Sequence, residues 1–141
     1  MSDPAFGQSS NPVRAEGAPR RRMPAEHVVY PEKKLVIVKF GNYLGLRDIE
    51  RYALLLKADP KFQAGFAEIV DLTAVEQFDL QADDFMKLAD HVDPFAPDAR
   101  RAFVARSSVQ QHAARMHKIL RSNQNIEIFS SVAAAERWVE S

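Results

Sequence analysis

The feature that most constrains the fold is an alternation of short β-branched or aromatic runs with stretches whose apolar residues recur at helical spacing. Each run has the length of a strand, and the four clearest runs span residues 35–40, 67–72, 101–106 and 126–129. A helix-like stretch follows each of them. Strands separated by helices pair in parallel through right-handed crossovers. The alternation therefore predicts an α/β domain with a largely parallel sheet.

A further run, at residues 27–30, precedes the first of these strands. The short segment 31–34 between them contains a proline, so the two runs should pair as an antiparallel hairpin. The predicted order is β-β-α-β-α-β-α-β-α. It gives a mixed sheet of about five strands, with an antiparallel first edge strand, the others parallel, and four helices.

The first two predicted helices have recognisable starts. Residues 41–45 are predicted to form a loop, Gly45 is the predicted N-cap of the first helix, and Asp48 places negative charge in its first turn. Pro60 ends this helix. Asp79 is the predicted cap of the second helix, whose core-facing residues are Phe85, Leu88 and Val92.

The last two predicted helices begin at serines. Ser108 with Gln111 three residues later is a capping-box pattern for the third helix. The predicted apolar stripe of this helix consists of Val109, Ala113, Met116 and Leu120. Ser131 opens the fourth helix, which contains Ala135, Trp138 and Val139.

The N-terminal segment differs in composition from the rest of the chain. Residues 1–24 hold four of the eight prolines and few large apolar side chains, so we expect a disordered basic tail. The arginines at residues 20–22 are interpreted as solvated, and Met23 is an alternative start site. Residues 25–141 are predicted to form a single domain.

Composition excludes several classes of site. The chain has no cysteine, so disulfides, thiolate catalysis and zinc–sulfur sites are excluded. A formal net charge of zero argues against nucleic acid as a partner. There is no secretory signal and no apolar run long enough to span a bilayer, so we expect a cytoplasmic protein.

No catalytic or metal-binding constellation is visible either. His112 and His117 are five residues apart and therefore lie on different faces of a helix. The chain lacks a phosphate loop, a nucleotide-binding glycine fingerprint and a serine nucleophile elbow. We predict no enzyme activity, no cofactor and no metal site.

Several local motifs, in this order, resemble the SpoIIAA-like family, which has the fold of the STAS domain. The resemblance covers about residues 26–141, and its motifs are Phe40-Gly41, Asp71-Leu72-Thr73, Ala114-Arg115-Met116, Ala134-Ala135 and Trp138-Val139. It implies a binding or regulatory module. In the anti-sigma-factor antagonists of this fold, a serine just after an aspartate is phosphorylated at the start of the second helix.

The matching stretch here does not carry that serine. Asp79 is followed by Leu80 and Gln81, neither of which has a hydroxyl group. We therefore expect a module that works without the phosphoserine switch. Thr73 lies nearby in the sequence but at a strand end.

One edge of the predicted sheet gathers polar residues. Ligands of open α/β sheets bind beyond the carboxyl ends of the strands, and this edge would hold Asp71, Thr73, Asp79, Arg106, Ser107 and Ser108. One interpretation is a site for a small anion or a phosphorylated partner, because a helix N-terminus favours negative charge. The other, which we favour, is ordinary capping.

A second candidate surface is the basic side of the third helix. Arg115, Lys118 and Arg121 could face an acidic partner or anionic lipid head groups. Solvated charge is the favoured interpretation, so a membrane surface is not expected.

Two functions remain open. The first is a non-enzymatic regulatory or protein-binding module; the alternative is a carrier or sensor of a lipophilic or anionic small molecule. A pocket for the alternative could involve Phe85, Phe103, Met116 and Trp138, although a filled core is the preferred interpretation. A homodimer also remains open.

Overall fold

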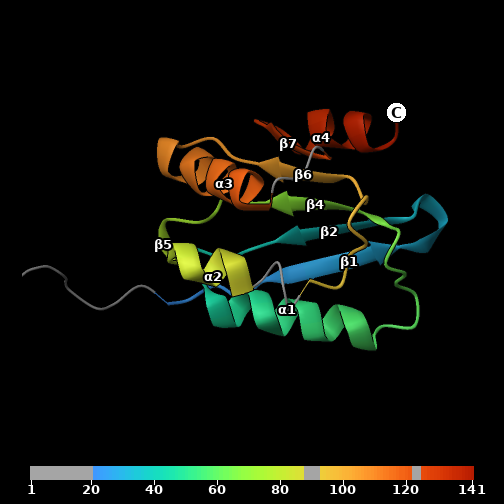
Figure 1. Ribbon diagram of the computed structural model, residues 1–141, viewed down its shortest axis with the longest axis horizontal. Coiled ribbons are helices and arrows are strands. Elements are labelled where there is room, and N and C mark those ends of the chain that lie inside the picture. The colour runs from blue at the N-terminus through green and yellow to red at the C-terminus, as the bar shows by residue number, and fades with distance from the viewer. Residues whose placement is uncertain (1–20, 88–92, 122–124) are drawn as a thin grey trace, which may run out of the picture.

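The computed structural model describes residues 21–87, 93–121 and 125–141, which form a mixed α/β structure around one main sheet (Figure 1). This sheet has five strands in the order β1-β2-β4-β6-β7. The strands are β1 (Glu26–Tyr30), β2 (Leu35–Lys39), β4 (Ala67–Asp71), β6 (Arg101–Val104) and β7 (Ile126–Phe129). β1 is antiparallel to β2, and all other neighbours are parallel. The predicted fold class is confirmed.

The hairpin that opens the sheet is closed by a short 3-10 turn, η1 (Pro31–Lys33). Lys34 follows with a φ of 53°, and its N–H donates to the carbonyl of Pro31. This left-handed residue reverses the chain so that Tyr30 pairs with Leu35. The hairpin predicted from residues 27–30 and 35–40 is confirmed.

Helices cover both faces of the sheet. They are α1 (Leu46–Ala58), α2 (Ala82–Lys87), α3 (Ser108–Arg121) and α4 (Val132–Val139). Buried residues of α1 and α3 belong to one core cluster, whereas Ala135 of α4 belongs to another on the opposite face. No helix in the described part of the chain is long and apolar enough to cross a lipid bilayer.

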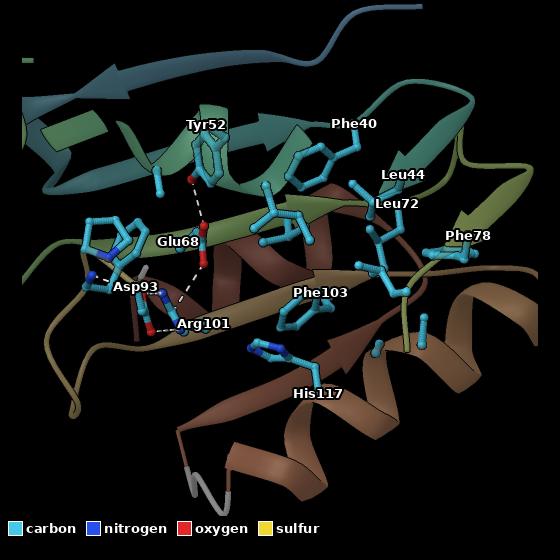
Figure 2. Close-up of a pocket in the computed structure, with 18 residues that line it drawn as sticks. Phe40, Leu44, Tyr52, Glu68, Leu72, Phe78, Asp93, Arg101, Phe103 and His117 are labelled. Carbon is cyan, nitrogen blue, oxygen red and sulfur yellow. Dashed lines mark hydrogen bonds and ion pairs between the residues drawn. The ribbon is translucent and has the colours of Figure 1, made fainter. Parts of the chain in front are cut away.

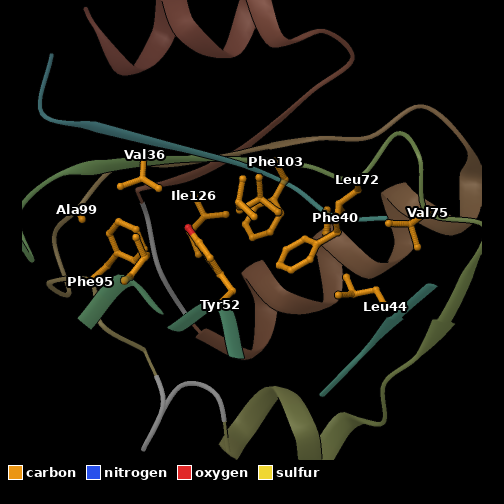
Figure 3. Packing of buried hydrophobic residues seen from close by; sticks show 14 of the residues in the cluster. Val36, Phe40, Leu44, Tyr52, Leu72, Val75, Phe95, Ala99, Phe103 and Ile126 are labelled. Atoms are coloured by element: carbon orange, nitrogen blue, oxygen red, sulfur yellow. The ribbon is translucent and has the colours of Figure 1, made fainter. Parts of the chain in front are cut away.

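Strand residues alternate between these two cores. In β6, Phe103 enters the core beneath α1 and α3 (Figure 3), while Ala102 and Val104 enter the core beneath α4. In β4, Val70 and Ile69 divide in the same way. This is the period of two that a strand imposes, and both faces are apolar because both are covered.

The structure also contains a small second sheet that the sequence did not predict. β3 (Tyr43–Gly45) and β5 (Gln77–Asp79) pair in parallel. The prediction of a loop at residues 41–45 is therefore wrong for β3, and the prediction of Asp79 as a helix cap is also wrong, because α2 begins three residues later, at Ala82. Both strands have three residues, too few to show a period.

Of the other three helix starts, two agree with the sequence and one differs. The Gly45 N–H donates to Asp48 Oδ2, and the Ser131 hydroxyl accepts from the Ala134 N–H, so both predicted caps are confirmed. At α3 the capping box lies one residue earlier than predicted. It joins Ser107 and Gln110 by reciprocal side-chain bonds of 3.1 Å.

This shift changes which residues of α3 face the core. Gln110 and Ala114 are buried, with Ala113 and His117 beside them, whereas Val109 is 57% exposed. Val109 was therefore wrongly assigned to the apolar stripe. The side chains of Phe85, Leu88 and Val92 lie outside the described residues, as does the tail up to residue 20. The division at residue 24 thus stays a prediction.

Candidate ligand-binding cavity

A cavity of about 90 Å³ lies on the α1 and α3 side of the sheet (Figure 2). Its apolar part is lined by strand and loop residues of the main sheet and by Leu44 and Phe78 of the small sheet. The main-sheet residues are Phe40, Val70, Leu72 and Phe103. The β3–β5 sheet therefore forms one wall of the cavity.

The space exists because both helices present small side chains to the sheet. Ala53 of α1 and Ala113 and Ala114 of α3 line the cavity. A methyl group at these positions leaves a volume that a leucine would fill.

One end of the cavity is polar. Four residues from four segments meet there: Tyr52 of α1, Glu68 of β4, Asp93 from the loop before β6, and Arg101 of β6. We call these four residues the charge network. Glu68 and Arg101 are register partners in the β4–β6 ladder, which brings their side chains to the same place.

The charge network is closely bonded. The Tyr52 hydroxyl donates to Glu68 Oε2 at 2.7 Å, and Arg101 Nη1 donates to Asp93 Oδ2 at 2.7 Å. Arg101 Nη2 also bonds Asp93 Oδ1, so the pair is bidentate. Arg101 Nε lies 3.3 Å from Glu68 Oε1. These contacts hold two carboxylates and a guanidinium whose side chains are no more than 9% exposed.

Burial and charge shift the titration of this network. Burial, followed by the neighbouring Glu68 carboxylate, raises the pKa of Tyr52 well above its usual value of 10.0. Burial alone would lower the pKa of Arg101, but Glu68 and Asp93 outweigh it and raise that pKa. Arg101 also lies over the Phe95 ring, with its guanidinium carbon 4.6 Å from the ring centroid. The tyrosine is therefore neutral and the arginine charged at physiological pH.

His117 of α3 adds a further polar group to the lining. Its ring centroid is 5.2 Å from that of Phe103, and Figure 2 shows the imidazole beside this phenyl ring. Within residues 21–87, 93–121 and 125–141, no three His, Asp or Glu side chains are grouped so that they could hold a metal ion.

The polar residues predicted at the carboxyl ends of the strands lie elsewhere and are joined mainly to each other. Asp71 Oδ1 accepts from the N–H and hydroxyl of Thr73, at 2.9 and 2.6 Å. Gln110 Nε2 donates to the carbonyls of Thr73 and Val75, and Gln110 also bonds Ser107. The structure thus brings Asp71, Thr73 and Ser107 together, with Gln110 as the link that the sequence did not reveal.

Of the other predicted site residues, Arg106 joins this group through its backbone N–H, which donates to Gln110 Oε1, whereas the side chains of Asp79, Ser108 and Arg115 do not. Asp79 accepts a 2.6 Å bond from the Tyr43 hydroxyl, which raises the pKa of that tyrosine. Arg106 donates to the carbonyl of Ser130, and Ser108 is an exposed first residue of α3. Arg115 lies farther along α3, in a shallow groove beside Lys118 and β7.

Of the four aromatic and methionine residues considered for a pocket, Phe103 lines the cavity. Trp138 packs against the core on the opposite face of the sheet, next to Phe129 and Arg100, which agrees with the preferred interpretation that it fills the core. Met116 is not among the lining residues, and the Phe85 side chain lies outside the described part.

Sequence reasoning missed Glu68 and Arg101, although a signal was present. Glu68 is a charged residue within the run predicted to be a buried strand, and Arg101 is the first residue of the run predicted to be the next strand. Charges are rarely buried without a partner, so two such positions in neighbouring strands indicate a pair.

Comparison with known proteins gives the fold. No family model matches the sequence, and no curated protein matches it. Among solved structures, an uncharacterized protein of the DUF3478 family with a SpoIIAA-like fold, from Shewanella loihica PV-4, is similar with a TM-score of 0.62. The match covers 88% of this chain and 99% of that one at 19% sequence identity. The SpoIIAA-like fold expected from the sequence motifs is confirmed.

Proposed function

We propose that this SpoIIAA-like chain is a non-enzymatic binding module for a small, mostly apolar molecule. The apolar body of the ligand occupies the cavity between the sheet, α1 and α3, and a polar group of the ligand faces the charge network. The observation that carries this proposal is the cavity itself, because a fully packed core would have excluded a carrier or sensor. The apolar lining and the single polar end match the general form of small-molecule sites.

The size of the cavity restricts the ligand. A dry apolar cavity of roughly 150 Å³ binds benzene, and the cavity here measures about 90 Å³. The ligand is therefore a compact molecule, or the end of a longer one whose remainder lies outside. Expansion of the cavity on binding would move α1 or α3, which gives a sensor its output.

Indole is a suitable first probe, because it has an apolar ring and one hydrogen-bond donor, and because it is larger than benzene, so that its entry requires the expansion of the cavity described above. We expect indole to shift the NMR methyl signals of cavity residues such as Leu44, Val70 and Leu72 in a saturable way. Ala114→Leu should abolish these shifts, because the added isobutyl group occupies the cavity. Ala133→Leu is the matched control, since Ala133 lies on α4 and is exposed.

The proposal is wrong if the wild-type chain, shown to be folded by its NMR dispersion, binds neither indole nor any molecule retained from its native cell in native mass spectrometry. Equal indole binding by the wild type and by folded Ala114→Leu would also contradict it, because binding would then occur elsewhere.

A protein partner is the second candidate function. It is supported by four aliphatic side chains that are about half exposed or more, Leu54 and Leu55 on α1 and Val109 and Ile119 on α3. Leu54 and Leu55 are neighbours on α1, and contiguous exposed apolar surface marks interaction sites. Because the same two helices line the cavity, a ligand there could regulate the partner. We expect Leu54→Glu with Leu55→Glu to lose a partner that the wild type and a Lys57→Glu control both retain in affinity capture.

A further inference from the structure

Residues 21–23 lie across the start of β3, and we propose that they act as a strap that holds the β3–β5 wall of the cavity closed. The significance of this wall rests on the function proposed above. The strap itself rests on contacts between residues 21–23 and the segment from Gly41 to Asp48.

The backbone of the strap is bonded to a single side chain. The Met23 N–H donates to Asn42 Oδ1 at 2.9 Å, and Asn42 Nδ2 donates to the carbonyl of Arg21 at 3.2 Å. Asn42 is 8% exposed, so its amide is enclosed by these contacts. A side-chain amide that uses both its donor and its acceptor on one passing chain fixes the position of that chain.

Arg22 adds a second attachment. Its Nη2 donates to both carboxylate oxygens of Asp48, at 3.0 and 3.2 Å, and its guanidinium carbon lies 4.2 Å from the centroid of the Tyr43 ring. The Arg22 side chain is 62% exposed, so the ion pair is weak. The bonds to the buried Asn42 amide therefore hold the strap in place, while the exposed Arg22–Asp48 ion pair adds little to its stability.

Gly41 shows that the strap passes very close to the domain. A Cβ built on Gly41 would lie 1.9 Å from the carbonyl oxygen of Met23, and its three nearest atoms all belong to Met23. The requirement for glycine at this position therefore comes from the strap. An alanine at residue 41 would therefore clash with Met23 in its present position, so Gly41→Ala must displace the strap.

Each attachment lies next to a residue of the cavity wall. Tyr43 precedes Leu44, and Asp48 precedes Ile49, and both Leu44 and Ile49 line the cavity. The carbonyl of Asn42 accepts from the N–H groups of Glu76 and Gln77, at the start of β5. The strap is thus bonded to the segment from Gly41 to Asp48, which contacts β5 and leads from β3 into the first turn of α1.

The test is Gly41→Ala in the full chain, with Gly65→Ala as the matched control, because nothing lies within 4 Å of a Cβ at Gly65. Hydrogen exchange should show that the amides of Tyr43 and Leu44 exchange about tenfold faster in Gly41→Ala, the effect of losing one or two hydrogen bonds. Exchange in β4 and β6 should not change. Indole should dissociate faster from Gly41→Ala and at the wild-type rate from Gly65→Ala.

A second variant, Arg22→Ala with Asn42→Ala, removes the same attachments without adding an atom and should give the same pattern. Unchanged exchange at Tyr43 and Leu44 in both variants would overturn the strap. Faster exchange with unchanged indole dissociation would overturn its role in closing the cavity. If the wild type does not bind indole, the proposed function fails, and the exchange measurement alone then decides whether the strap exists.

Discussion

At the scale of single residues, the charge network dominates the energetics of the candidate site. Arg101 is 5% exposed and is shared between Glu68 and Asp93. Removing one partner from a buried ion pair costs about 3–5 kcal/mol, because the remaining charge stays buried. An exposed pair contributes at most ~1 kcal/mol. The consequence of losing a charge should therefore depend on where the charge lies.

We predict that Arg101→Met lowers the free energy of unfolding by about 3–5 kcal/mol, because two buried carboxylates lose their counter-ion. Lys118→Met is the control, since the Lys118 side chain is 38% exposed and pairs with Glu127, whose side chain is 45% exposed. Its effect should stay below ~1 kcal/mol. Urea unfolding measures both, and similar values for the two variants would contradict the assignment of Arg101 to a buried network.

The Tyr52 hydroxyl should make stability depend on alkaline pH. Its folded-state pKa is raised well above the usual 10.0, so ionisation favours the unfolded chain. The stabilisation is complete below about pH 10 and is lost as the pH rises from there towards the folded-state pKa, by up to ~1.4 kcal/mol per pH unit.

The measurement is urea unfolding of the wild type and of Tyr52→Phe at a series of pH values from about 8 to 11. The difference in unfolding free energy between them should be constant up to about pH 10 and should then shrink. Parallel curves across the whole range would mean that Tyr52 is not the titrating group.

Some of this residue-scale pattern was accessible from the sequence. Glu68 and Arg101 each stand out as a charge in an apolar strand run. Tyr52 and Asp93 do not, because an aromatic residue on a helix and an aspartate in a proline-containing loop are ordinary in both places. Their role comes from the positions of α1 and the loop over the sheet, which no local pattern encodes.

At the scale of elements, the start of α3 depends on Gln110. Its side chain accepts from the N–H groups of Arg106 and Ser107 and donates to the carbonyls of Thr73 and Val75. It therefore caps the helix and also ties it to the loop after β4. The side chain of Gln111, the residue predicted from the sequence for the capping box, donates one long bond of 3.5 Å to the Arg106 carbonyl.

We expect Gln110→Ala to lower the free energy of unfolding by about 2–3 kcal/mol, because it leaves buried backbone groups without partners. Gln111→Ala should change it by no more than ~0.5 kcal/mol. Thermal and urea unfolding of the two variants decide between the two registers of the capping box, and the larger loss in Gln111→Ala would restore the register predicted from the sequence.

The elements that were predicted well are the long ones. The strands of the main sheet and the three longest helices carry enough residues to show a period, and their order was correct. β3, β5 and the start of α2 were missed because their position is set by bonds between distant segments, such as Asn42 with Glu76 and Gln77. Two overlapping S-x-x-Q patterns, at Ser107 and Ser108, left the register of α3 undecided by sequence alone.

At the scale of the whole molecule, the point at which the domain begins can be measured. The tail predicted for residues 1–24 includes the strap at residues 21–23. Whether the strap belongs to the folded domain can be decided by how much stability is lost when it is removed. A chain beginning at Arg21 should retain the unfolding free energy of the full chain within ~0.5 kcal/mol. A chain beginning at Pro24 should lose about 1–2 kcal/mol, since it lacks the bonds to Asn42 and Asp48.

Urea unfolding of the two shortened chains provides the comparison. Equal stability of both would place the start of the domain after the strap, and a loss already present in the chain beginning at Arg21 would place it within residues 1–20.

The cavity is a property of the whole molecule, and the sequence could not predict it. Ala53 and Ala114 are ordinary helix residues, and whether a small side chain leaves a void depends on what faces it across the sheet. The fold follows from the order of strands and helices, whereas the cavity depends on how the side chains of α1, α3 and the sheet pack against one another.

The charge network also has a kinetic consequence. Its members come from α1, β4, the loop before β6 and β6, so it cannot assemble until these segments have met and water has left. Contacts that form after the transition state slow unfolding without speeding folding. Arg101→Met should therefore accelerate unfolding in stopped-flow experiments and leave the refolding rate nearly unchanged. On this view the buried charges determine how long the native state persists once it has formed.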